Sequence, residues 1–249
     1  MVGCGAVRAD PSDPPPDAAV KLPPPSPIVD PPPVVTVVPV PPPEPFGGLN
    51  ADAAFVLDAE ACHAQLDEWG VPWEPADDAP DSIEQPLRLT GPVAGVRFTV
   101  PGEEGTVHEV LDCRLAVSLA EWARQLAAHG VVEAKLFSFY RRGARVGSHV
   151  RPEPTQHNYG LAADVGWFEL ADGRELSVRE DFRVETDGID TCGGVPRDDR
   201  AVLLLAFFCE PIAESIFHVQ LSPAHDREHF NHYHVDIGGS GGVGGWFVQ

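Results

Sequence analysis

The order of helix-like and strand-like segments predicts an α+β fold for this chain, with a single domain in which flanking helices surround a small antiparallel sheet. Two patterns carry that prediction. Apolar residues recur at helical spacing between Asp112 and His129, where Asp112 can cap the start and Gly130 can end the helix. Further along, Asp172-Gly173 lies between two strand-like runs, which is a strong signal for an antiparallel hairpin.

The other elements follow from the same kinds of pattern. Helices are predicted over residues 58–69 and 198–216, the second broken near Pro211, and residues 70–81 are predicted to form a loop. Apolar and β-branched runs predict strands within 87–100 and over 134–141, 161–170, 175–178, 217–222 and 233–237.

Proline triplets dominate the start of the chain, and the last of them is Pro41-Pro42-Pro43. Because proline locks φ and has no backbone N–H, this part is predicted to be a disordered or polyproline II linker. It would act either as a spacer that holds a domain away from a membrane or as a ligand for a proline-binding domain. The chain therefore divides into a linker over 1–45, a domain over 46–237 and a glycine-rich tail over 238–249.

Composition restricts the partners of this protein. The 249 residues include 38 acidic and 17 basic side chains, for a formal net charge of -21. Such a surface repels polyphosphate and anionic lipid, so nucleic acid is excluded as an expected partner. Hydrophobic residues make up 43% of the chain, which is enough for a sizeable core, but no run reaches the roughly 18 apolar residues of a membrane span.

Five cysteines are present, and none forms a CxxC pair, so a cysteine-rich structural zinc site is not expected. Four of them lie in the predicted domain, where they can form two disulfides. The fifth, Cys4, follows Val2-Gly3, and this tripeptide resembles the end of a bacterial lipoprotein signal. On that interpretation Cys4 carries a lipid anchor and an apolar segment precedes it; the alternative is a chance cysteine near an arbitrary start.

A first candidate site lies at the segment from His157 to Asp164. Gly160 lets the chain turn sharply after His157, and Asp164 falls inside an apolar, strand-like run. A buried carboxylate needs a charged or hydrogen-bonding partner. That partner is either a metal ion or an arginine such as Arg141 or Arg142.

A second candidate site is the histidine cluster between His229 and His234. In an extended strand His232 and His234 point to the same face, and His229 lies on the preceding loop. Zinc binds neutral imidazole and carboxylate ligands, and a catalytic zinc uses three protein ligands and keeps a fourth position open. The two segments together predict a zinc site rather than a chance surface cluster of histidines.

This pair of motifs resembles the zinc site of the peptidases grouped with lysostaphin, the D-Ala-D-Ala peptidases and the Hedgehog signalling domain. More closely, most of 61–237 resembles bacterial extensin-like C-terminal domain proteins. That resemblance is carried by four stretches, which are 112–116, 157–165, 170–175 and 229–236.

The resemblance implies zinc ligands at His157, Asp164 and His234. It implies catalytic roles beside the metal for His232 and His229, while Arg142 is assigned to bind a substrate carboxylate or to be a plain surface charge. Many relatives carry a glutamate base three positions before the last ligand.

Three departures from the family pattern stand out in this chain. Asn231 occupies the position of the glutamate base, and Glu228 lies further away. The family's Cys-Gly near Ile83 and the Cys-Arg after Tyr140 are also missing. Pairing the four domain cysteines simply in chain order gives Cys62–Cys113 and Cys192–Cys209.

The resulting expectation is zinc-dependent hydrolysis of amide bonds in peptidoglycan, as by a murein endopeptidase or carboxypeptidase. A non-catalytic domain that binds the cell wall and retains the peptidase fold is the alternative, favoured by Asn231. A scaffold whose function lies in the proline-rich arm would leave the histidines unexplained. The expected location is the bacterial cell envelope, either periplasmic or as a membrane-anchored lipoprotein.

Overall fold

The computed structural model describes residues 47–142, 145–146, 149–150, 155–186 and 190–238. Its centre is a six-stranded sheet in which the strands follow the order β12-β13-β8-β5-β3, with β9 also paired to β8. All these neighbours are antiparallel except β3 and β5, which are parallel. The strands are β3 (Arg97–Thr99), β5 (Val131–Ser138), β8 (Ala162–Leu170), β9 (Glu175–Ser177), β12 (Val219–Leu221) and β13 (Tyr233–Asp236).

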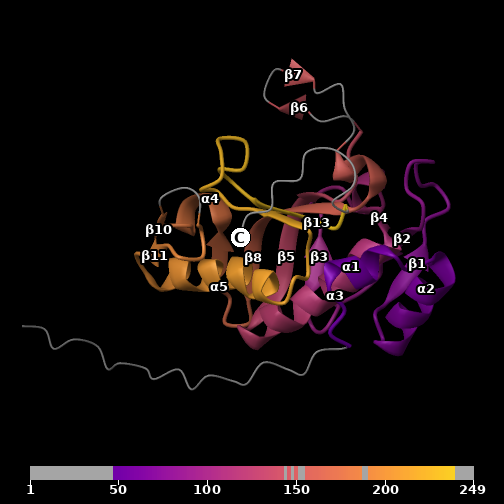
Figure 1. Ribbon diagram of the computed structural model, residues 1–249, viewed down its shortest axis with the longest axis horizontal. Helices are drawn as coiled ribbons and strands as arrows, with labels where there is room; N and C mark the ends of the chain where they lie inside the picture. The colour runs from indigo at the N-terminus through magenta and orange to yellow at the C-terminus, as the bar shows by residue number, and fades with distance from the viewer. Residues whose placement is uncertain (1–46, 143–144, 147–148, 151–154, 187–189, 239–249) are drawn as a thin grey trace, which may run out of the picture. The chain divides into compact units, whose positions relative to one another are not determined.

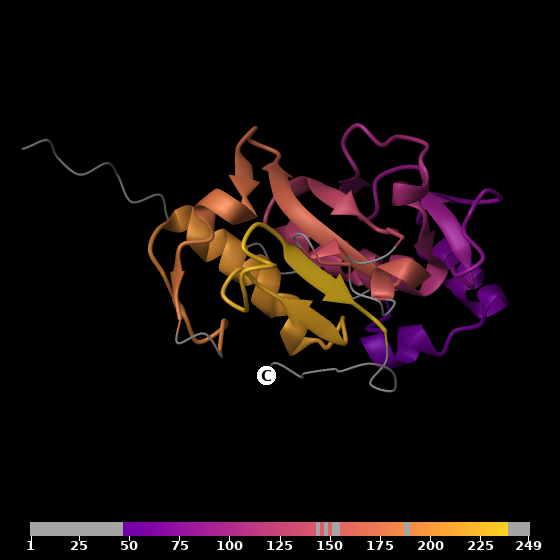
Figure 2. The same cartoon turned by 90° about the horizontal axis from the view of Figure 1, so that it is seen from above.

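Two long helices, α3 (Cys113–Ala128) and α5 (Asp199–Ala213), lie on the same side of this sheet (Figure 1). Figure 2 shows β8, β13 and β12 in front of α5. Trp122 of α3 is almost fully buried and makes edge-to-face contacts with Phe168 of β8 and with Phe217. The main core therefore lies between the two helices and one face of the sheet.

Pro211 lies inside α5, yet the helix continues to Ala213. A proline inside a helix lacks the N–H that would bond the carbonyl four residues earlier, which here belongs to Phe207. The indole N–H of Trp122 donates to that carbonyl at 3.0 Å instead. The predicted break near Pro211 is therefore wrong, because tertiary structure satisfies the carbonyl that proline leaves without a partner.

A second, three-stranded sheet joins β1 (Trp73–Pro75), β2 (Pro86–Leu89) and β4 (Leu111–Asp112). Two helices, α1 (Ala51–Phe55) and α2 (Ala59–Glu68), precede it, and both pack against α3. A disulfide between Cys62 and Cys113 ties α2 to the start of α3. This sheet ends where α3 begins, so it fixes the position of that helix start.

Short elements connect these layers. A second disulfide, Cys192–Cys209, ties the connection between β10 and β11 to α5. The short elements are η1 (Val107–Glu109), β6 (Arg145–Val146), β7 (His149–Val150), η2 (Gln156–Tyr159), α4 (Val178–Asp181), β10 (Val184–Glu185) and β11 (Val195–Pro196).

The α+β class is confirmed, and so are the helices predicted over 58–69 and 112–129, which have Asp58 and Asp112 as N-caps. The hairpin at Asp172-Gly173 is confirmed by the β8–β9 pairing. The central sheet is larger than predicted and contains one parallel pair. The predicted loop over 70–81 contains β1, because three residues without periodicity are extended by pairing with β2.

Several predictions fall outside the described residues. They are the proline-rich linker over 1–45, the lipid anchor at Cys4 and nearly all of the glycine-rich tail. Within the ranges that the structure describes, no helix combines the length and apolar character needed to cross a membrane.

Candidate metal centre

The candidate site is assembled by two neighbouring strands and one short helix. In the register of β8 and β13, Asp164 lies directly opposite His234. His157 comes from η2, and Gly160 follows it with a φ of 66°, in the left-handed region that favours glycine. A Cβ at Gly160 would lie 2.8 Å from the backbone nitrogen of Asp112. Gly160 therefore allows η2 to pack closely against the start of α3.

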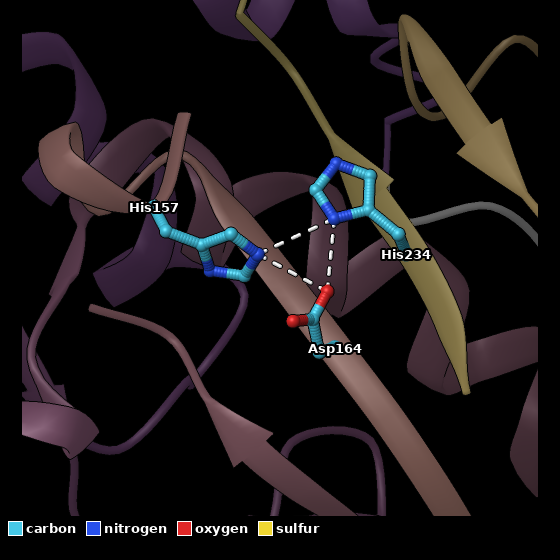
Figure 3. A group of neighbouring side chains, drawn as sticks. All are labelled: His157, Asp164 and His234. Carbon is cyan, nitrogen blue, oxygen red and sulfur yellow. Dashed lines mark hydrogen bonds and ion pairs between the residues drawn. The ribbon is translucent and has the colours of Figure 1, made fainter. Parts of the chain in front are cut away.

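Three potential ligand atoms converge between these elements (Figure 3). The Nε2 atom of His157 lies 3.1 Å from Oδ1 of Asp164 and 3.3 Å from Nδ1 of His234. The same Nδ1 lies 2.9 Å from Oδ1 of Asp164. His157 and Asp164 are fully buried, and His234 is 9% exposed. The structure thus brings together the three residues that the sequence analysis selected as ligands.

In His157 and His234, the ring nitrogen that points away from Asp164 (the outer nitrogen) contacts an acceptor, and this contact determines the tautomer of the ring. Nδ1 of His157 lies 2.8 Å from the backbone oxygen of Phe139, and Nε2 of His234 lies 3.0 Å from Oδ2 of Asp236. Both outer nitrogens must therefore carry a proton and donate it. In the neutral rings, the two inner nitrogens then present lone pairs towards the Asp164 carboxylate. Three facing acceptors need a shared cation, either a proton or a metal ion.

In the absence of a metal, a proton on His234 fills that role. Burial disfavours the charged ring, but hydrogen bonds to Asp164 and Asp236 raise the pKa of His234 to about 9. Burial lowers the pKa of His157, which therefore stays neutral at pH 7. Burial also disfavours ionisation of Asp164, yet its contacts with His157 and the other imidazoles hold the pKa of this carboxyl well below its usual range.

The second oxygen of Asp164 faces an arginine. Nη1 of Arg141 lies 2.8 Å from Oδ2, which is an ion-pair distance. The contact lacks hydrogen-bond geometry, so Oδ2 is buried without a hydrogen-bond partner, as is Nε2 of His232. Asp164 therefore has both of the partners considered from sequence, an arginine on one side and a potential metal position on the other. The unpartnered Nε2 of His232, which lies 3.4 Å from Oδ1 of Asp164, fits a site that binds a cation.

His232 lies at the edge of this group. It is 8% exposed, and its Nε2 lies 3.4 Å from Oδ1 of Asp164. Its Nδ1 lies 2.9 Å from the side-chain oxygen of Asn231. Asn231, which occupies the position where the resemblance predicted a glutamate base, therefore orients His232.

His229 lies one ring further out, with its centroid 5.2 Å from that of His232 and 5.9 Å from that of His234. Its Nδ1 lies 2.7 Å from Oδ1 of Asp226, an oxygen that also accepts from the backbone N–H of His229. Burial lowers the pKa of His229 against the attraction of Asp226, so the ring is neutral at pH 7. Sequence reasoning missed Asp226; its position three residues before His229 was the only signal.

The predicted substrate-binding residue, Arg142, is exposed. Arg141 is the arginine that contacts Asp164. It is held there by its backbone N–H, which donates to the carbonyl of His157. Glu228 is exposed on the loop that carries His229.

Fold and site together define an α+β domain with a buried His-Asp-His group that could hold a metal ion. The family model described as extensin-like protein C-terminus matches residues 60–244, and the chain belongs to this family. Neither the curated proteins nor the solved structures contain a match to this chain.

Proposed function

We propose that this protein is a zinc-dependent hydrolase that cleaves amide bonds in the stem peptides or cross-links of peptidoglycan. The observation that carries the proposal is the convergence of His157 Nε2, Asp164 Oδ1 and His234 Nδ1, with both tautomers fixed by outer acceptors. Ligand atoms at about 2.0–2.1 Å from a tetrahedral zinc lie roughly 3.3 Å from one another. The three observed separations are 2.9, 3.1 and 3.3 Å, close to that spacing.

Each protein group has a role in the proposed reaction. A bound zinc supplies Lewis acidity and activates water at neutral pH. His229, held by Asp226 and neutral at pH 7, accepts the proton of the attacking water. His232, whose Nδ1–H is held by the side-chain oxygen of Asn231, presents the lone pair of Nε2 to the site and is a second candidate proton acceptor. Arg142, which is exposed, binds a substrate carboxylate.

The two disulfides support a location outside the cytoplasm, because such bonds persist in oxidising compartments. An anchor at Cys4 followed by a proline-rich spacer would place the domain within reach of the wall. We therefore propose a periplasmic or lipid-anchored protein of the bacterial cell envelope whose partner is peptidoglycan.

Zinc binding is expected to release about one proton per chain at pH 7. With its pKa raised to about 9, His234 is protonated at that pH, and the metal must displace the proton from Nδ1. Apparent affinity should therefore rise about tenfold per pH unit between about pH 6 and about pH 8, and level off above about pH 9. Calorimetry in buffers of different ionisation enthalpy measures the proton count. An affinity independent of pH over this range would contradict the assigned proton position.

The catalytic proposal is tested with purified sacculi. The zinc-loaded chain is expected to release muropeptides or open cross-links, detected by mass spectrometry, and chelation should stop the reaction. His229→Ala should lower the rate by about 10²–10⁴-fold while zinc remains bound, because it removes only the proton acceptor. If His229→Ala and wild type act at equal rates, another group is the base.

A non-catalytic wall-binding domain is the second candidate, favoured by one observation. Asn231 cannot act as the carboxylate base that relatives carry at this position, and it contacts His232 instead. If the zinc-loaded chain sediments with sacculi but leaves every cross-link intact, binding is the better account.

A further inference from the structure

An exposed aromatic ring lies near the end of β5 in the central sheet, next to the candidate metal centre. Phe137 is 40% exposed, and at this position β5 is paired with β8 on one side while its pairing with β3 ends at Lys135. Core packing gives no reason for a phenylalanine there, because the core lies on the opposite face of the sheet, against α3 and α5. A contiguous exposed apolar patch commonly marks a binding surface.

The backbone turns this ring towards the site through two register shifts. Lys135 pairs with Trp167 and Leu136 with Val165, which leaves Gly166 as an extra residue in β8. Ser138 then pairs with Asp164, which leaves Phe137 as an extra residue in β5. Bulges of this kind re-aim side chains and are common next to active sites.

The ring of Phe137 packs against the backbone of Gly166. A Cβ at Gly166 would lie 3.1 Å from Cε2 of Phe137, so the absence of a side chain at Gly166 allows this close packing. Trp167 flanks the ring, with centroids 5.0 Å apart in an edge-to-face arrangement. On the other side the ring meets His232 at 5.8 Å. These three aromatic side chains form a continuous platform that ends at the candidate metal centre.

The distance from the platform to the ligand group is short. His232 contacts Phe137 through its ring and approaches Oδ1 of Asp164 to 3.4 Å through Nε2. A carbonyl held at the ligand group would therefore place the side chain of its own or the adjoining residue over Phe137. The platform therefore adjoins the ligand group at which the proposed function places the scissile bond.

The charges around the platform restrict what it can bind. Next to Trp167, the ammonium group of Lys135 is already paired with Glu169 at 3.2 Å and with Glu175 at 2.6 Å. Lys135 is therefore not available to pair with an acidic side chain of a substrate. Phe137 itself contacts the rings of Trp167 and His232 and the backbone at Gly166. The platform suits an uncharged, apolar group.

We propose that Phe137 and Trp167 form a specificity subsite for an apolar side chain, such as the methyl group of an alanine, in the stem-peptide residue next to the scissile amide. This inference rests on the proposed function for its substrate, but it concerns binding and does not require hydrolysis. The subsite explains why β5 carries an exposed phenylalanine whose ring lies against Gly166.

The test compares Phe137→Ala, Phe137→Leu and Val202→Ala in the full zinc-loaded chain, by co-sedimentation with purified sacculi. Phe137→Ala should bind sacculi about fivefold to tenfold more weakly, the size of a lost aromatic contact and its buried area. Phe137→Leu should retain most of the binding. Val202, exposed on α5 across the sheet, is the matched control and should bind as wild type does. Zinc content should be unchanged in all three variants.

Competition identifies the group that is bound. An alanine-containing stem peptide should displace the protein from sacculi, and the same peptide with aspartate in place of each alanine should compete about fivefold less well. Peptide-free glycan strands should not compete. Equal binding by Phe137→Ala and Val202→Ala, competition by glycan alone, or a wild-type chain that does not sediment would each overturn the subsite. A wild-type chain that binds no zinc, or that hydrolyses no bond in sacculi, would instead count against the proposed function.

Discussion

Replacing Asp164 by alanine is expected to reduce zinc from about one ion per chain to none. Asp164 is the residue that both histidine nitrogens approach, at 3.1 and 2.9 Å, and it is fully buried. Without it, only two neutral imidazoles would face the metal, and the anionic ligand that balances its charge would be lost. Elemental analysis of protein purified with zinc supplied measures the content directly.

A second measurement separates metal loss from misfolding. In wild type, zinc at about 100 times its Kd should raise the free energy of unfolding by about 2.7 kcal/mol, whereas Asp164→Ala should show no zinc-dependent rise. Asp236→Asn is the graded control. The Asp236 carboxylate contacts Nε2 of His234 and none of the three ligand atoms. The zinc affinity of Asp236→Asn should therefore fall about 10–100-fold, but zinc should still bind. A wild-type chain that stays metal-free with zinc present would refute the assigned site.

Residue patterns indicated the two segments of the candidate site, and the family resemblance then selected His157, Asp164 and His234 as ligands. Side-chain alternation predicted that His232 and His234 share a face, and both approach the same oxygen of Asp164. The apolar run around Asp164 predicted a buried carboxylate that needs a partner. Gly160 indicated the turn that returns His157 to the strand, and its φ is indeed positive.

What sequence could not supply depends on contacts between distant segments. The arginine at Asp164 is Arg141 rather than Arg142, because β5 ends at Ser138 and the backbone of Arg141 then bonds His157. The strand predicted over 134–141 ends three residues early for the same reason. The bulge at Phe137 likewise depends on Gly166 in another strand, and no local pattern indicates it.

Removing the Cys62–Cys113 disulfide is expected to cost about 4 kcal/mol of stability. The two cysteines are 51 residues apart, and closing a loop of that length removes roughly this much chain entropy from the unfolded state. The bond is also linked to the segment that carries His157. Cys113 follows Asp112, whose backbone N–H donates to the carbonyl of Gly160, next to the turn that positions His157.

The matched control is the Cys192–Cys209 disulfide, whose cysteines are 17 residues apart in sequence. By the same loop-length relation, this disulfide should contribute about 3 kcal/mol to the free energy of unfolding. Paired Cys→Ala variants, compared by urea unfolding, measure both values. Because only the first bond adjoins the segment that carries His157, Cys62→Ala/Cys113→Ala should also weaken zinc binding, whereas Cys192→Ala/Cys209→Ala should leave it unchanged. If the shorter loop proved the more stabilising, loop entropy would not be the main source of the effect. The packing of Cys209, a residue of α5, against the core would then account for it.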